Sequence, residues 1–195
     1  MSEKDFKKKY DLIPANDKLL CNPLENFDMK DPPVDPEELA RELIGHMRYF
    51  GGIGLSANQL GLPYRVFVME GDPAFVCFNP RITAYAGEDI SMDEGCLSYP
   101  GLYIKKKRPQ IIRCRFFDPL GNAVVKKFSG MSARIFQHEM EHMEGGNFLE
   151  GISKLKLDMA KKRQEKLLRK VQKQRKLLLK AEKAGLIKKK DPNES

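Results

Sequence analysis

Residues Ile135–Gly146 have the sequence IFQHEMEHMEGG. It places His138 and His142 four residues apart, with Glu139 next to the first of them. The apolar residues around them, and the pair of glycines that ends the stretch, predict a helix over about 132–143. On a helix both imidazoles project from one face, so the stretch predicts two metal ligands with an acid/base group beside them.

A catalytic metal centre of this kind needs a third protein ligand and an open position. A third histidine is missing downstream, because Phe148 stands where the longer HExxH patterns require it. Glu165 is a poor candidate in a basic tail, and His46 fits a packed, hydrogen-bonded histidine better. Cys96 is the remaining soft ligand, in the polar segment DEGCLSYPG (93–101) between expected strands. With the two histidines it would suit Fe(II), Zn, Ni or Co.

A glycine-rich stretch, GGIGLSANQLG (51–61), is the third feature with chemical meaning. It lacks the pattern of a phosphate-binding loop, and its plain interpretation is a helix end followed by a turn. Its glycines would let the backbone approach a ligand closely. The amide of Gln59 could donate a hydrogen bond to a carbonyl oxygen, which makes it the informative residue of the stretch.

The remaining pattern indicates an α+β fold. A first helix is predicted after Asp35, which is a plausible N-cap, with Pro36 at the first helical position and Glu38 completing a capping box. Another helical segment runs from about Ile152 to Lys183, and the last residues, KKKDPNES, are expected to be disordered. Five runs rich in β-branched and aromatic residues predict strands between the helices, and DPLGN (118–122) predicts a turn: YRVFVME, AFVCFNP, ITAYAG, IIRCRFFD and AVVKKF.

Length and charge predict one domain with an appendage. The chain has 195 residues, and residues 153–190 carry 16 Lys and Arg against three acidic side chains, while the first 152 residues are mildly acidic. We therefore expect a catalytic domain over 1–152 and a basic helix with a disordered end over 153–195. The N-terminus resembles neither a secretory signal nor a transit peptide, and no transmembrane stretch is present. These features predict a cytoplasmic protein with no membrane partner.

Four cysteines without CxxC spacing fit reduced thiols rather than a disulfide framework. Three of them lie in or near apolar runs, where burial in the core is the expected role: Cys21, Cys77 and Cys114.

The segments GIGLSANQ, EGCLS and QHEMEH, in this order, resemble the three signature motifs of the peptide deformylases, over roughly residues 10–155. The EGCLS form resembles the type I, bacterial-like branch. The resemblance implies antiparallel sheets packed around a central helix that carries HExxH. It also implies removal of the N-formyl group from the formyl-methionine of new peptides, with release of formate. The host would be a bacterium, or a bacterium infected by a virus, with an organelle as the alternative if a presequence has been removed.

Carried over residue by residue, the resemblance makes Cys96, His138 and His142 the ligands of one metal ion. Fe(2+) would be the physiological metal, with Zn(2+), Ni(2+) or Co(2+) as substitutes. Glu139 would be the catalytic acid/base. The oxyanion would be bound by Gln59 and the backbone N–H of Leu97.

Four positions would form the pocket for the methionine side chain: Ile53, Gly54, Met131 and Ile135. Ordinary core packing is the alternative role for the apolar ones among them. Two departures from the family pattern, Ser56 in place of Ala and Met143 in place of Leu, are expected to lie away from the chemistry.

The basic tail has two interpretations, a solvated helix packed on the body by a narrow apolar stripe or a dock for ribosomal RNA. The stripe predicted from the sequence contains Ile152, Leu155, Met159, Leu167, Val171 and Leu178.

Two further function classes compete with a deformylase: another HExxH metallohydrolase such as a small metalloprotease, and a nucleic-acid-binding protein without enzymatic activity.

Overall fold

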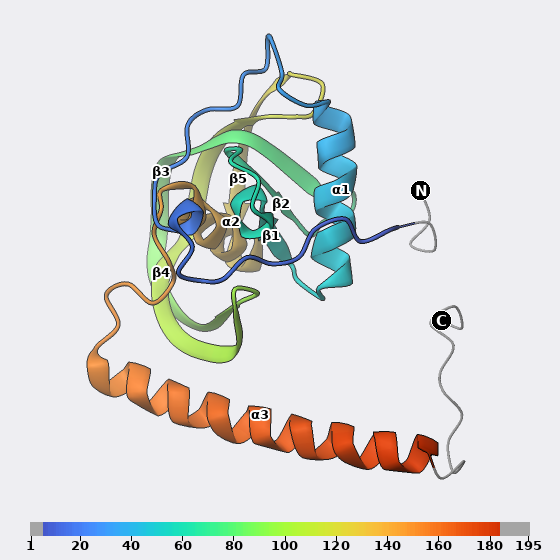
Figure 1. Cartoon of the computed structure of the whole chain (residues 1–195). Coiled ribbons are helices and arrows are strands. Elements are labelled where there is room, and N and C mark those ends of the chain that lie inside the picture. Colours follow the sequence, from blue (N-terminus) through green and yellow to red (C-terminus); the bar gives the residue numbers. More distant parts are fainter. Residues whose placement is uncertain (1–5, 184–195) are drawn as a thin grey trace.

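A curved antiparallel sheet of five strands encloses one helix in the computed structural model, which describes residues 6–183 (Figure 1). The α+β fold predicted around the HExxH helix is confirmed. The elements in chain order are η2 (Lys18–Leu20), α1 (Pro36–Tyr49), β1 (Gly54–Ser56), η3 (Ala57–Leu60), β2 (Val66–Met69), β3 (Phe75–Cys96), β4 (Tyr99–Phe117), β5 (Ala123–Ser129), α2 (Gly130–Met143) and α3 (Lys154–Lys183).

The strands follow one another in the sheet in chain order, from β1 to β5, and each pairs antiparallel with the next. Register shifts interrupt the pairing of β3 with β4 at several points, and bulges of this kind bend a strand and increase its twist. The two runs expected as separate strands over 74–80 and 82–87 therefore belong to one bent strand, β3. The short strand β1 was not expected from the sequence, whereas the predicted turn at Asp118 is present.

The short strand β2 is buried on both faces, and this explains its unbroken apolar sequence. Phe67 and Met69 face the core cluster that contains Phe136 of α2. The alternate residues Val66 and Val68 face a second cluster, built on α1. Helices α1 and α2 thus cover opposite faces of this part of the sheet, with α2 at the centre of the molecule (Figure 1).

Helix α1 begins as predicted, with the Asp35 side chain accepting a hydrogen bond from the backbone N–H of Glu38. His46 on this helix is fully buried, as the sequence analysis favoured. Its Nε2 atom accepts hydrogen bonds from the backbone N–H groups of Lys9 (3.2 Å) and Tyr10 (2.9 Å). The N-terminal segment therefore lies along α1 and is held there by His46.

Helix α3 confirms the long helix predicted after Ile152, but only part of the predicted stripe packs on the body: Ile152 lies against a buried cluster of β4 and Leu167 lies near Gly101. Leu155 is 71% exposed, while Ala160 is buried among residues of β4. The expected disordered end, KKKDPNES, lies outside the described residues.

Within residues 6–183, none of the helices has the length and apolar character of a membrane span.

Candidate metal centre

Three potential metal ligands meet between α2 and the end of β3. His138 and His142 project from the buried face of α2, and Cys96 is the last residue of β3. The ligand atoms of the three residues all lie within 4.8 Å of one another. Cys96 Sγ is 3.3 Å from His142 Nε2, so both atoms face a common point. A thiolate and two imidazoles at this separation fit a single ion with an open coordination position.

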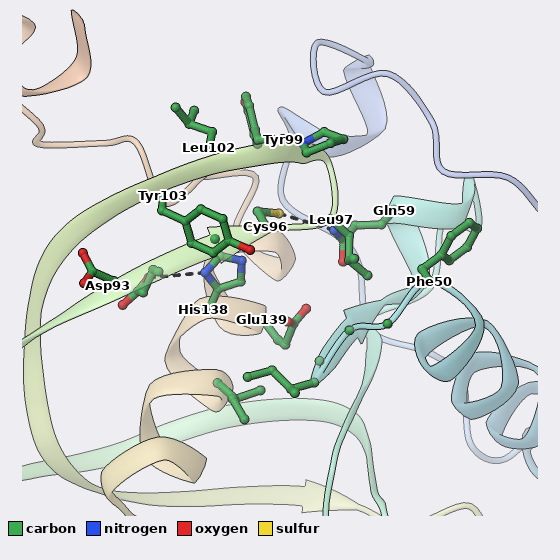
Figure 2. A pocket seen from close by; sticks show the side chains of 18 of the residues that line it. Phe50, Gln59, Asp93, Cys96, Leu97, Tyr99, Leu102, Tyr103, His138 and Glu139 are labelled. Carbon is green, nitrogen blue, oxygen red and sulfur yellow. Dashed lines mark hydrogen bonds and ion pairs between the residues drawn. The ribbon is translucent and has the colours of Figure 1, made fainter. Parts of the chain in front are cut away.

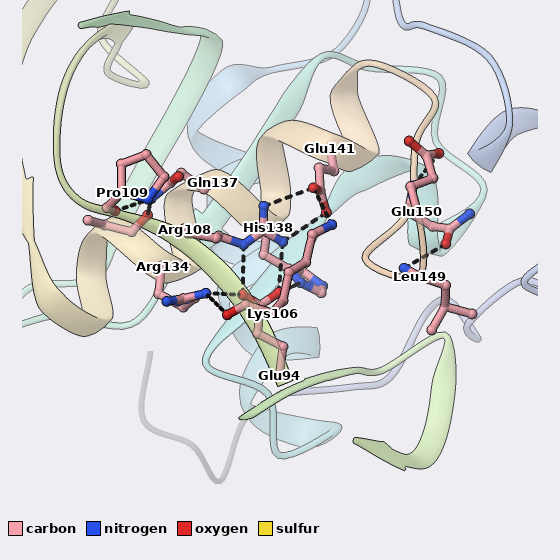
Figure 3. A network of polar contacts seen from close by, with 12 residues as sticks. Glu94, Lys106, Arg108, Pro109, Arg134, Gln137, His138, Glu141, Leu149 and Glu150 are labelled. Carbon is pink, nitrogen blue, oxygen red and sulfur yellow. Dashed lines mark hydrogen bonds and ion pairs between the residues drawn. The ribbon is translucent and has the colours of Figure 1, made fainter. Parts of the chain in front are cut away.

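A buried carboxylate orients the first histidine. Glu94 Oε2 lies 3.4 Å from His138 Nδ1, which leaves Nε2 of the ring for a metal (Figure 3). Two arginines hold Glu94: Arg108 donates to both of its oxygens at 2.7 Å, and Arg134 donates to Oε1 at 2.7 Å. Arg108 also pairs with Glu141. A carboxylate behind a ligating histidine fixes its tautomer and ring orientation.

The charges of this network determine the protonation of its members. Burial acts to raise the pKa of Glu94, but hydrogen bonds from Arg108, His138 and Arg134 hold it well below its usual range. Burial acts to lower the pKa of His138, yet its contacts with Cys96 and Glu94 raise it to about 10. Burial and the neighbouring charge of His138 lower the pKa of His142 to about 3. A metal at this site would be held by the neutral form of both imidazoles, since only a neutral imidazole ligates.

Glu139 is a buried carboxylate beside the three ligands. Its Oε2 atom has no hydrogen-bond partner within the described residues, and burial raises the pKa of its carboxyl group to about 7. The backbone of Gly54 passes close to it, because a Cβ atom there would lie 2.5 Å from Glu139 Oε1 and 2.8 Å from Ile135 Cγ2. Glycine is needed at this position so that strand β1 can approach the carboxylate.

The amide of Gln59 is fixed in one orientation. Its Oε1 accepts hydrogen bonds from the backbone N–H of Ser56 at 3.0 Å and from the Ser56 hydroxyl at 3.1 Å. Its Nε2 consequently points to the metal centre, where it lies 3.5 Å from Cys96 Sγ and donates to Ser98 Oγ at 3.0 Å. Ser56 was expected to lie away from the chemistry, but its hydroxyl contacts Gln59, the residue expected to bind the oxyanion. Met143 lies in the core as a buried side chain.

A cleft of about 620 Å³ opens onto these residues (Figure 2). It is lined by all four residues expected to form the methionine pocket, and by Leu97 from the turn after Cys96. Of the four, Ile135 is buried, whereas Ile53 and Met131 are 54% and 49% exposed. Ile135 therefore lies on the inner wall of the cleft, and Ile53 and Met131 lie at its exposed mouth. Core packing is not the role of these two exposed residues.

Two other candidates lie elsewhere. His46 packs under the N-terminal segment, and Glu165 is an exposed residue of α3 that pairs with Arg169. Cys77 and Cys114 are buried as expected, but the prediction is wrong for Cys21, which is exposed because it caps η2 at the surface.

Glu94, Ser98 and Phe148 also belong to the site, although they were not predicted from the sequence. Glu94 could have been found, since it stands two residues before Cys96 in a strand and so shares its face. Phe148 packs its ring 5.5 Å from that of His138, and Arg108 supports the site from β4. Phe148 and Arg108 carried no signal in the sequence, because only the folded chain brings them to the metal centre.

A helix with two histidines and a glutamate, completed by a cysteine from a neighbouring hairpin, defines a metal-dependent hydrolase. The family model described as polypeptide deformylase matches residues 9–158. The chain belongs to the polypeptide deformylase family, whose activity is the metal-dependent removal of the N-formyl group from new peptides.

Relatives and solved structures agree with this assignment. The chain is 32% identical to a peptide deformylase of Wolbachia pipientis subsp. Culex pipiens, over 81% of this chain and 94% of the relative. A Rhodopirellula baltica peptide deformylase is 42% identical over 60% of each chain. A crystal structure of a Synechococcus elongatus peptide deformylase in complex with actinonin has a TM-score of 0.77 at 30% identity, covering 85% of this chain and 91% of that one. A plant peptide deformylase has a TM-score of 0.74 at 30% identity, covering 87% and 95%.

Proposed function

We propose that Cys96, His138 and His142 hold one divalent ion, with Glu139 as the catalytic acid/base. The observation that carries this proposal is the convergence of three ligand atoms within 4.8 Å beside a buried carboxylate oxygen that has no partner in the described part of the chain. A bound divalent ion supplies Lewis-acid polarisation and lowers the pKa of a bound water. Glu139 accepts the proton of the attacking water and delivers it to the leaving amine.

Gln59 and the backbone N–H of Leu97 are proposed to stabilise the charge on the formyl oxygen. The Gln59 amide supports this role because Ser56 holds its oxygen and turns its N–H donors toward Cys96. A donor held in place before the reaction needs no reorganisation when charge develops.

The proposed metal is Fe(2+), with Zn(2+), Ni(2+) or Co(2+) as substitutes. One thiolate and two imidazoles suit all four ions, and the softness of the thiolate disfavours Mg²⁺ and Ca²⁺. The proposed substrates are formyl-methionyl nascent peptides. Ile53, Gly54, Met131 and Ile135 would receive the methionine side chain, and the missing Cβ atom at Gly54 keeps the cleft open next to Glu139.

The decisive experiment is anaerobic formate release from a formyl-Met tripeptide, with metal analysis on the same sample. Glu139→Ala should retain the metal and lose about 10²–10⁴-fold in turnover. Glu165→Ala is the matched control, because it removes an exposed glutamate of α3. Near-wild-type turnover of the Glu139→Ala variant would reject Glu139 as the acid/base. An unchanged metal content in the Cys96→Ala variant would reject Cys96 as the third metal ligand.

A small metalloprotease is the competing function, and casein cleavage measured beside formate release separates the two. The arrangement of α3 disfavours the protease, because the glutamate that such an enzyme would need as a third ligand, Glu165, is exposed and paired with Arg169.

The exposed basic face of α3 is proposed to dock on ribosomal RNA, in the cytoplasm where new formyl-methionyl chains emerge. A set of Lys and Arg side chains gives salt-dependent affinity that is independent of sequence. Replacing Lys173, Lys176 and Lys180 by Gln should flatten the salt dependence of ribosome binding, by about 0.7–0.9 in log–log slope for each lost phosphate contact. The control replaces three exposed lysines of the sheet, Lys105, Lys107 and Lys127. Equal salt-dependence slopes for ribosome binding in the two variants would contradict the proposal that α3 docks on ribosomal RNA.

A further inference from the structure

The tip of the β3–β4 hairpin contains residues that the sheet does not hold. Gly95 pairs with Tyr103, and the next pair is Cys96 with Tyr99. The three intervening residues of β4, Pro100–Leu102, therefore have no partners on β3 and form a bulge, here called the hairpin bulge. All three line the cleft that opens onto the metal centre. Without partners on β3, the backbone polar groups of the bulge are left for water or for another part of the chain.

Helix α3 supplies the missing contacts. The Gln164 side chain donates a hydrogen bond from Nε2 to the Pro100 carbonyl oxygen at 2.7 Å. Leu167 and Leu168 lie against Gly101, since a Cβ built on that glycine would be 3.6 and 3.7 Å from their Cδ2 atoms. Gly101 has a φ of +73°, which favours glycine and allows the bulge to approach the helix. Figure 1 shows α3 running past this end of the hairpin.

The third residue of the bulge, Leu102, is buried with Ala160 of α3 and Phe148. The ring of Phe148 lies 5.6 Å from that of Tyr99 and 5.5 Å from that of His138. The contacts of α3 with the bulge therefore continue through packed side chains to a proposed metal ligand.

The α3 residues in these contacts, Ala160, Gln164, Leu167 and Leu168, recur at helical spacing and share one face. Beyond Leu168 the leucines of α3 are exposed, among them Leu177 at 58% and Leu178 at 57%. Within residues 6–183, the helix thus has a first part that contacts the cleft wall and a second part whose leucines are exposed.

We propose that the first part of α3 positions the outer wall of the catalytic cleft, with Gln164 as the positioning residue that fixes the Pro100 carbonyl. This inference deepens the proposed deformylase function and rests on it. The bulge would keep its shape while a peptide enters, so the main effect of loosening it falls on substrate binding. The groups on α2 and η3, among them Glu139 and Gln59, would be affected less. Cys96 lies in the same hairpin but is paired with Tyr99 outside the bulge.

The test compares two triple variants of the full chain with identical residue types and spacing. The clamp variant is Gln164→Met, Leu167→Ala and Leu168→Ala, and the control is Gln174→Met, Leu177→Ala and Leu178→Ala, ten residues further along α3. For a formyl-Met tripeptide, the clamp variant should raise KM about 3- to 10-fold with kcat within about twofold, and the control should match the wild type. Amide hydrogen exchange over residues 99–103 should accelerate in the clamp variant only.

Equal KM values and equal exchange in the two triple variants would overturn the proposal. Gln164→Met alone removes one hydrogen bond and keeps the apolar contacts, so it decides the question if the clamp variant does not fold. Gln164→Lys retains a donor and should restore the wild-type KM. If the wild type released no formate, the proposed function would fail, while the exchange comparison would still decide whether α3 holds the bulge.

Discussion

The Ser56 hydroxyl donates a hydrogen bond of 3.1 Å to Gln59 Oε1, inside the capping box of η3 where both side chains are buried. The backbone N–H of Ser56 donates to the same oxygen at 3.0 Å. Two donors on Oε1 leave the N–H groups of the amide free to face Cys96 and Ser98. The side chain of Ser56 thus acts on the group proposed to bind the formyl oxygen.

Replacing Ser56 by Ala should therefore lower kcat/KM for a formyl-Met peptide by about 2- to 10-fold, the usual range for one net hydrogen bond. The loss stays modest because the backbone donor remains. Ser91→Ala, an exposed serine of β3, is the control and should leave the rate unchanged. Steady-state kinetics on both variants check this, and a rate for Ser56→Ala equal to the control would show that the backbone donor alone suffices.

The carboxylate behind His138 gives a second prediction. Glu94→Gln should weaken metal affinity by about 10- to 100-fold, because the neutral amide orients the ring less strongly. It should also lower the melting temperature, since Arg108 and Arg134 lose a buried charged partner. Asp93→Asn, at an exposed neighbour paired with Lys105, is the control. Metal content after dialysis and thermal melting measure the two effects, and unchanged metal retention would remove Glu94 from the support of the centre.

The two-histidine helix and its cysteine were predictable because each carried a local signal, the HExxH spacing and a thiol in a polar segment. The capping of α1 and the turn at Asp118 were predictable for the same reason, since both depend on neighbours in the chain. The parts that were missed depend on distant neighbours. Strand β1 has three residues and exists through its pairing with β2, which no local pattern reports.

The packing face of α3 shows the same limit. The sequence offers several apolar positions on a polar helix, and selecting the most regular stripe put Leu155 and Val171 inside, although both are exposed. The face that packs includes Ala160 and Gln164, a small residue and a polar one. Ala160 packs against Leu102 of the hairpin bulge, and Gln164 donates to the Pro100 carbonyl oxygen of the same bulge. The bulge belongs to another part of the chain, so the sequence of α3 alone does not report these contacts. The division into a domain over 1–152 and a tail stays a prediction.

Thiol reactivity should report the state of the metal centre. Burial raises the pKa of Cys114 to about 11 and that of Cys77 well above its usual range, so at pH 8 both stay as protonated, unreactive thiols. Cys21 is exposed and should react in the folded protein. Titration with a chromogenic disulfide should therefore count about one thiol with metal bound, about two after chelation exposes Cys96, and four in denaturant. Cys21→Ala should reduce each count by one, and a count that chelation does not change would argue against Cys96 as a ligand.

His46 holds the N-terminal segment on α1. Its Nε2 accepts two backbone N–H groups and its Nδ1 lies 2.7 Å from the Glu42 carbonyl oxygen, so the ring must be the neutral Nδ1–H tautomer. His46→Ala leaves the N–H groups of Lys9 and Tyr10 without this acceptor and should cost about 1–3 kcal/mol of unfolding free energy. The segment continues to Ile13, whose N–H donates to the Gln59 carbonyl oxygen at 2.9 Å, so hydrogen exchange should also accelerate at Ile13. Arg41→Ala, exposed on the same helix, is the control for denaturant unfolding. If His46→Ala changed stability and exchange no more than Arg41→Ala, the segment would be held by its apolar contacts instead.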